Sequence, residues 1–195
     1  MFKIVFQLLF FPLLLSAQLD KAFNKKIGIT EDLSSKEIRV YKKADITNSV
    51  SLFRLYQNDE LVWKSEYYEC HFILQEDGGD DFRKIEITSS KELSYVWLEI
   101  LNSDILYLPE QAVFKYKLKG KAKIKTIDGK YESQASIMAV LDGESYAVQI
   151  RAGDKKNSFE YDNPKMYLKY YPKVDELQSF IDLLKVLKNR FAISI

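Results

Sequence analysis

Six lysines occupy every second position from residue 115 to residue 125, a spacing that could bind an anionic partner through electrostatic attraction. Alternate side chains of a β-strand lie on one face about 6.6 Å apart, so a continuous strand over residues 114–125 would carry a row of cations. Such a row can bind an anionic polysaccharide, lipid head groups or an acidic protein surface. The alternative is a solvent-facing strand whose lysines prevent pairing with other chains, or a strand that Gly120 interrupts. The lysines are Lys115, Lys117, Lys119, Lys121, Lys123 and Lys125.

The only cysteine, Cys70, directly precedes the only histidine, His71. A thiol nucleophile needs a base within hydrogen-bond reach, and adjacent residues of a strand point to opposite faces. Because the surrounding residues predict a strand, we expect Cys70 to be buried and His71 to lie on the other face, with no catalytic pair. One histidine and one cysteine on opposite faces also provide too few ligands for a conventional zinc site, so no metal or cofactor is predicted.

Two other groups of side chains could bind a ligand. Residues 76–81 (EDGGDD) offer carboxylate oxygens to calcium, but their spacing does not match the EF-hand loop, and a solvated turn is the favoured interpretation. Tyr167, Tyr170 and Tyr171 could contact a sugar or a protein, because tyrosine keeps a polar tip in water while its ring is buried. The favoured interpretation is that these rings belong to a strand edge and loop that seal the sheet beneath the last helix. No catalytic residue is assigned.

Period-two alternation predicts the strands that would position these groups. The clearest runs in the first half of the chain cover residues 37–41, 50–56, 61–74 and 82–88. Within the third run the apolar positions change from odd to even after Tyr67. Because a strand cannot change faces without an extra residue or a bend, this change predicts a β-bulge near residues 65–68.

Turn residues organise the second half of the chain. Asp128-Gly129 and Asp142-Gly143 each separate alternating runs, and Asp-Gly at such a position indicates a β-hairpin. Residues 121–162 are therefore predicted to form a four-stranded antiparallel meander.

Two amphipathic helices are predicted, one inside the chain and one near its C-terminus. Ser89 and Glu92 have capping-box spacing, and apolar residues at helical spacing follow as far as Ser103. A second apolar stripe extends from Asp175 to Phe191, with cations in its second half, where they suit the helix dipole. The predicted fold is α+β: an antiparallel sheet of about seven to nine strands, with an internal helix and a C-terminal helix packed on it.

Residues 1–17 (MFKIVFQLLFFPLLLSA) have one lysine, an apolar block and a small residue at their end, the pattern of a cleaved export signal. The apolar block is shorter than the roughly 20 residues that a bilayer span needs, although a retained anchor or a buried N-terminal helix is the alternative. We expect cleavage after Ala17 and export to the periplasm, the outer surface or the medium. Residues 18–195 would then form one α+β domain without a transmembrane segment, in which residues 18–35 are a short helix or a loose arm.

The charge balance and the absence of known motifs limit the function. The chain has 29 basic and 28 acidic residues, and removal of Lys3 with the export signal would leave 28 of each, which argues against nucleic-acid binding by phosphate neutralisation. No phosphate-binding glycine loop, dinucleotide fingerprint or metalloprotease motif occurs. We expect a non-enzymatic exported domain that binds a protein or an anionic envelope polymer. The alternatives are a carboxylate-based hydrolase of envelope polymers and an assembly module that pairs through a sheet edge.

Overall fold

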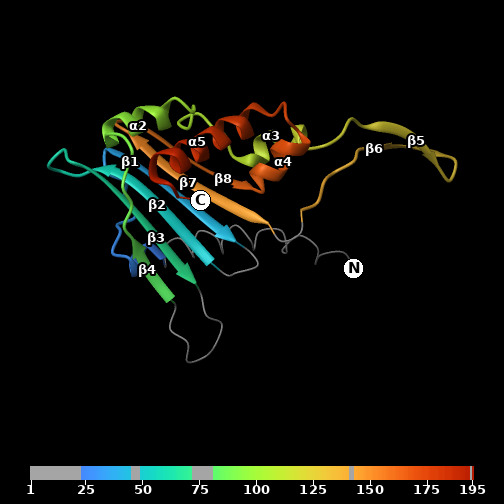
Figure 1. The fold of residues 1–195 in the computed structure, drawn as a ribbon. Helices are drawn as coiled ribbons and strands as arrows, with labels where there is room; N and C mark the ends of the chain where they lie inside the picture. The colour runs from blue at the N-terminus through green and yellow to red at the C-terminus, as the bar shows by residue number, and fades with distance from the viewer. Residues whose placement is uncertain (1–22, 45–48, 72–80, 141–142, 194) are drawn as a thin grey trace, which may run out of the picture. The chain divides into compact units, whose positions relative to one another are not determined.

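The computed structural model describes residues 23–44, 49–71, 81–140, 143–193 and 195 and has the α+β fold that the sequence predicts (Figure 1). The strands are β1 Lys36–Ala44, β2 Ser49–Gln57, β3 Trp63–His71, β4 Asp81–Ile85, β5 Lys123–Ile127, β6 Lys130–Gln134, β7 Glu144–Ala152 and β8 Lys155–Asp162. The helices are α2 Leu93–Leu101, α3 Gln111–Phe114, the 3-10 turn η1 Lys115–Lys117, α4 Pro164–Tyr170 and α5 Asp175–Phe191. All of these elements belong to one compact unit, residues 34–195.

Six strands form one antiparallel sheet in the order β4-β3-β2-β1-β7-β8, while β5 and β6 form a separate two-stranded sheet. The predicted meander over residues 121–162 is therefore wrong, although its four strands exist. β7 pairs with β1, which places Ile38 opposite Ile150 and Val40 opposite Val148. These pairs are buried, whereas β5 and β6 are exposed along their entire length. Burial of apolar surface against β1 thus outweighs pairing between neighbours in the chain.

The helices cover one face of the six-stranded sheet and form the main core with it. Figure 1 shows α2 and α5 on the same side of this sheet. The ring of Phe180 in α5 has its centroid 5.2 Å from that of Tyr146 and 5.2 Å from that of Tyr161. Phe191, at the end of α5, lies 4.9 Å from Phe53 of β2. The predicted apolar stripe of the C-terminal helix is confirmed, since its buried residues are Leu177, Phe180, Leu183, Leu184, Leu187 and Phe191.

The internal helix is also present, but it begins without the predicted capping box. α2 starts at Leu93, and its N-cap residue Glu92 makes no side-chain cap hydrogen bond. The hydroxyl of Ser89 instead accepts a hydrogen bond from the backbone N–H of Lys91, 3.2 Å away. Serine often makes such local hydrogen bonds outside helices. Ser89 therefore stabilises a turn that precedes α2 and does not cap the helix.

The pairing of β2 with β3 is continuous along both strands, so the β-bulge predicted near residues 65–68 is wrong. The apolar positions change because both faces of the sheet bury side chains at this point. Tyr67 belongs to the core on the helix side, and Tyr68 and Cys70 are buried on the opposite face. A strand that is buried on both faces carries apolar residues at consecutive positions without any extra residue.

The face opposite the helices contains a buried charge network, which we call the Glu37 network. Glu37 Oε1 accepts hydrogen bonds from Arg39 Nε at 2.7 Å and from Arg54 Nε at 2.6 Å. Glu37 Oε2 accepts one from the backbone N–H of Ser34 at 2.7 Å. Burial alone would raise the pKa of Glu37, but the hydrogen bonds from Arg54 and Ser34 and the two positive charges leave that pKa below its usual value. The network continues to Glu66, 3.3 Å from Arg54 Nη1.

Within residues 18–35, the described part contains one helical turn, residues 23–26. Gly28, which follows this turn, has a φ of 71°. The export segment (residues 1–17), most of the acidic turn (residues 76–80) and Asp142 lie outside the described residues. Among the helices that the structure describes, none is both long enough and apolar enough to cross a bilayer.

Candidate functional site

The lysine-rich segment folds in two parts and not as one strand. Lys115 and Lys117 lie in η1, and β5 begins only at Lys123. Gly120 lies between them, outside regular structure. Lys117 Nζ also forms an ion pair with Glu176, whose nearer carboxylate oxygen is 2.7 Å away. The six lysines therefore do not form one continuous row, and the interruption at Gly120 that the sequence left open is present.

The interruption has a packing cause. Phe114 and Leu118 are both buried, while Tyr116 between them is exposed. Burial of residues four apart is the helical spacing, and Phe114 packs edge-on against Tyr161 at 5.3 Å between ring centroids. A strand over the same residues would place Phe114, Tyr116 and Leu118 on one face.

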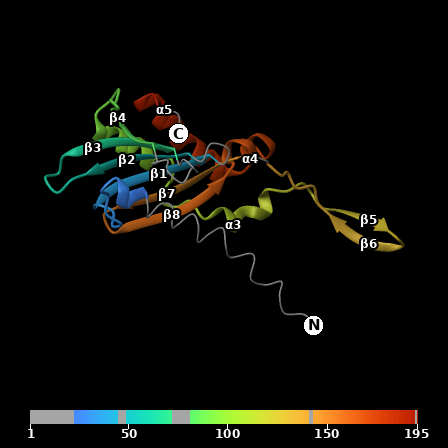
Figure 2. The same cartoon turned by 90° about the horizontal axis from the view of Figure 1, so that it is seen from below.

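Residues 119–136 form an exposed hairpin, which we call the arm. At its base the backbone N–H of Gly120 donates to the carbonyl oxygen of Ser136 at 2.8 Å. Asp128 and Gly129, both with positive φ, make the tight turn, as the Asp-Gly pattern predicts. Figures 1 and 2 show the arm standing away from the six-stranded sheet. An isolated two-stranded hairpin is only marginally stable in water.

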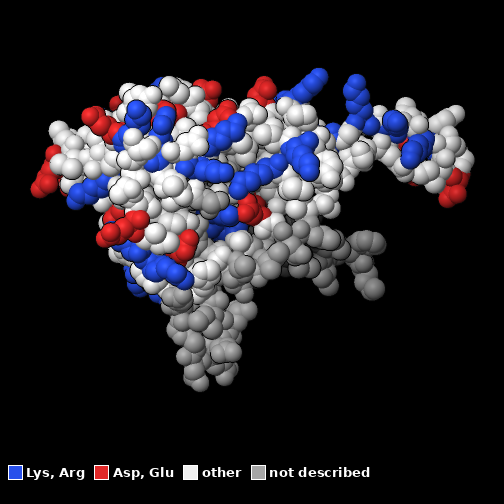
Figure 3. Space-filling view, viewed as in Figure 1, with Lys and Arg blue, Asp and Glu red and all other residues white. Residues whose placement is uncertain are grey.

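The two faces of the arm differ in chemical character. Strand alternation places Lys123, Lys125, Lys130 and Glu132 on one face. The other face carries Ile124 and Tyr131, whose exposed fractions are 77% and 84%. Five lysines and two carboxylates between residues 119 and 136 give the arm a net charge of +3. Figure 3 shows these basic side chains along the arm at the right of the view.

The three candidate tyrosines lie in or directly after α4. Tyr167 and Tyr171 stack at 6.4 Å between ring centroids and pack against the core, and burial raises the pKa of Tyr167. Tyr170 is exposed. Two of the three rings therefore have the packing role that the sequence favours, and a binding role for Tyr170 stays a prediction.

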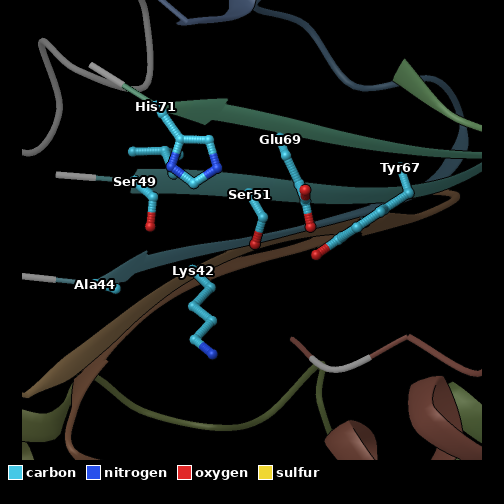
Figure 4. Close-up of a pocket in the computed structure, with 8 residues that line it drawn as sticks. Lys42, Ala44, Ser49, Ser51, Tyr67, Glu69 and His71 are labelled. Carbon is cyan, nitrogen blue, oxygen red and sulfur yellow. The ribbon is translucent and has the colours of Figure 1, made fainter. Parts of the chain in front are cut away.

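A cleft of about 340 Å³, which we call the sheet-end cleft, lies at one end of the six-stranded sheet (Figure 4). Its polar lining consists of Lys42 from β1, Ser49 and Ser51 from β2, and Tyr67, Glu69 and His71 from β3. Cross-strand pairing brings these groups together, since Ser51 lies opposite both Lys42 and Glu69 and Ser49 lies opposite His71. Figure 4 shows the Tyr67 hydroxyl, the Glu69 carboxylate and the Ser51 hydroxyl pointing to the same side.

One ion-paired carboxylate, Glu144, lies beside the cleft. Glu144 Oε1 is 2.7 Å from Lys42 Nζ, and Glu144 Oε2 accepts hydrogen bonds from the Tyr146 hydroxyl at 2.8 Å and from Lys165 Nζ at 3.2 Å. Burial would raise the pKa of Glu144, but the bonds from Lys42 and Tyr146 and the charge of Lys165 lower it to about 2. Burial and the negative charge of Glu144 raise the pKa of Tyr146. Glu144 is thus ionised at neutral pH and compensates the charge of Lys42.

Acid is expected to weaken the fold through Glu144. The unfolded chain takes up this proton near pH 4.5 and the folded chain only near pH 2, so the stabilisation is complete above about pH 4.5 and is lost as the pH falls towards 2. Urea unfolding at a series of pH values measures the effect. The stability of the native sequence should fall more steeply over this range than that of the Glu144→Gln variant. Parallel pH profiles for the two proteins would contradict the assignment.

The predicted separation of Cys70 and His71 is confirmed. Cys70 is buried, and His71 lines the cleft from the other face of β3. The cleft itself was missed, because the register that places Ser49 opposite His71 joins separate strands and has no local pattern in the sequence. The only available cue was the pair of small hydroxyl side chains, Ser49 and Ser51, on one face of a predicted strand.

The described residues give little support to catalysis by paired carboxylates or to metal binding. Glu69 is the only carboxylate among the described residues that line the cleft, and the neighbouring Glu144 has a lowered pKa, whereas a general acid needs a raised one. Within the described part of the chain, no group of three histidine, cysteine or acidic side chains is placed to hold a metal ion.

Comparison with known proteins adds no constraint to this geometry. No protein-family model, no curated protein and no solved structure matches the chain. The arm and the sheet-end cleft are therefore interpreted from their own residues.

Proposed function

We propose that this chain is a non-enzymatic binding protein, exported after removal of residues 1–17, and that the arm contacts anionic lipid head groups of the envelope. One observation carries the proposal: Ile124 and Tyr131 are almost fully exposed on a hairpin whose other face is rich in lysine. Apolar and aromatic side chains beside lysines suit the boundary between head groups and acyl chains. Each lysine near an anionic lipid surface contributes about 1 kcal/mol of binding free energy.

The same lysines could meet an acidic polysaccharide or an acidic protein. Contact through charge alone would leave the apolar face of the arm in water, with Ile124 and Tyr131 unused. A lipid surface offers both the phosphates that attract lysine and the apolar layer that accepts the other two side chains. The lipid surface is therefore the favoured partner, and the other two are outcomes of the test.

Reversing two charges of the arm is expected to remove most of the binding. For the chain beginning at Gln18, Lys121→Glu combined with Lys123→Glu should weaken binding to vesicles of phosphatidylcholine and phosphatidylglycerol by at least about 30-fold. Replacing Ile124 and Tyr131 by serine should weaken binding as well, because it removes the apolar contact. Co-sedimentation with the vesicles measures both effects, and added salt should weaken binding of the native sequence.

The matched control is Lys64→Glu combined with Lys91→Glu, which changes the net charge equally at two exposed lysines outside the arm. This control should bind the vesicles nearly as well as the native sequence. Equal loss in both double variants would show that only overall charge matters. Binding to soluble acidic polysaccharide that exceeds binding to vesicles, and that survives loss of Ile124 and Tyr131, would replace the lipid by a polymer.

A further inference from the structure

The sheet-end cleft arises because the helix-side face of the sheet changes from apolar to polar along its strands. Val40, Phe53 and Tyr67 lie side by side across β1, β2 and β3, within the core beneath the helices. One step further along the same face, the corresponding residues are Lys42, Ser51 and Glu69. Beyond these lie Ala44, Ser49 and His71. Figure 4 shows these side chains next to one another along the three strands.

The charges of the lining do not cancel inside the cleft. The ammonium of Lys42 is compensated by Glu144, 2.7 Å away. Glu69 has no ion-pair partner among the residues that the structure describes, although Arg83 of β4 lies opposite it across the strands. The Tyr67 hydroxyl is hydrogen-bonded to both Glu69 and Ser51. The cleft therefore presents the carboxylate of Glu69 to a ligand beside serine and tyrosine hydroxyl groups, a side-chain type that can both donate and accept hydrogen bonds.

The volume limits the size of the ligand. Small-molecule sites commonly have volumes of about 300–1,000 Å³ and combine a few convergent polar groups with apolar walls. At about 340 Å³ the sheet-end cleft lies at the lower end of this range. This volume suits one sugar ring rather than a length of polymer.

We propose that the sheet-end cleft is a binding site for a small hydroxyl-rich cation, a molecule of monosaccharide size that carries an amino group, such as an amino sugar. Glu69 pairs with the amino group, and Ser49 and Ser51 exchange hydrogen bonds with ring hydroxyl groups. This site is separate from the arm and does not depend on the lipid contact.

The test uses glucosamine as the probe, with glucose and glucuronate as its neutral and anionic counterparts. Calorimetric titration of the full chain at pH 7 should show glucosamine binding at least about 10-fold more tightly than glucose, because an ion pair with Glu69 is available only to the amine. Glucuronate should bind less tightly than either. Equal affinities for glucosamine and glucose, tighter binding of glucuronate, or no heat from any of the three would overturn the proposal.

Two variants and one control locate the binding. Glu69→Gln keeps the shape of the cleft and should reduce the affinity for glucosamine to that for glucose, whereas Glu86→Gln, at an exposed carboxylate elsewhere, should leave it unchanged. Ser49→Val fills part of the cleft and should weaken both sugars. Thermal unfolding of each variant shows whether it is folded. If Glu69→Gln is folded and binds glucosamine as tightly as the native sequence, the proposed site is wrong.

Discussion

Replacement of Glu37 by glutamine is expected to lower the free energy of unfolding by about 3–5 kcal/mol, the cost of removing one partner from a buried ion pair. Glu37 and Arg39 have fully buried side chains, and Arg54 is mostly buried. Without the carboxylate, the guanidinium groups of Arg39 and Arg54 lose the negative charge that lies 2.7 Å and 2.6 Å away, and Arg54 keeps the longer ion pair with Glu66. An amide accepts a hydrogen bond but does not compensate the charge.

Urea unfolding at neutral pH measures this loss. The control is Glu66→Gln, at the outer end of the Glu37 network, where the ion pair with Arg54 is longer, at 3.3 Å, and the second partner Lys84 is half exposed. That variant should lose less stability than Glu37→Gln, because Glu66 is 16% exposed whereas Glu37 is fully buried. Similar losses at both positions would show that burial does not set the strength of the network.

Replacement of Phe180 by alanine is the second large expected effect, again about 3–5 kcal/mol of unfolding free energy. Phe180 is fully buried in α5, and its ring contacts three aromatic rings of the sheet, those of Tyr146, Phe159 and Tyr161. The rings come from two strands and cannot close the cavity without moving the backbone of the sheet. The loss should therefore include both the transfer free energy of the ring and the cost of the cavity.

The control for this variant is Tyr161→Phe in the same cluster. The buried hydroxyl of Tyr161 has no hydrogen-bond partner among the described residues, so its removal should leave the stability unchanged or raise it slightly. Thermal and urea unfolding of the two variants measure the difference. A loss at Tyr161→Phe comparable with that at Phe180→Ala would mean that the hydroxyl does have a partner.

Patterns that depend on neighbouring residues predicted the elements well. The Asp128-Gly129 turn, the apolar stripe of α5 and the opposite faces of Cys70 and His71 all follow from local spacing, because backbone geometry alone determines which residues share a face. The errors arose where a local pattern had two solutions. Alternating lysines fit a strand, yet Phe114 and Leu118 are buried better by a helical turn. Consecutive Tyr67 and Tyr68 fit either a bulge or a strand that is buried on both faces, and the structure has the second.

By itself the amino-acid sequence determined the α+β class, most of the strands and helices, and the concentration of lysine in one segment. The tertiary structure alone decided that β7 pairs with β1, that the lysines divide between η1 and the arm, and that Lys42, Ser51 and Glu69 line one cleft. These features depend on contacts between residues far apart in the chain. Such contacts are selected by the total apolar surface that a pairing buries, a quantity that no single stretch of sequence contains.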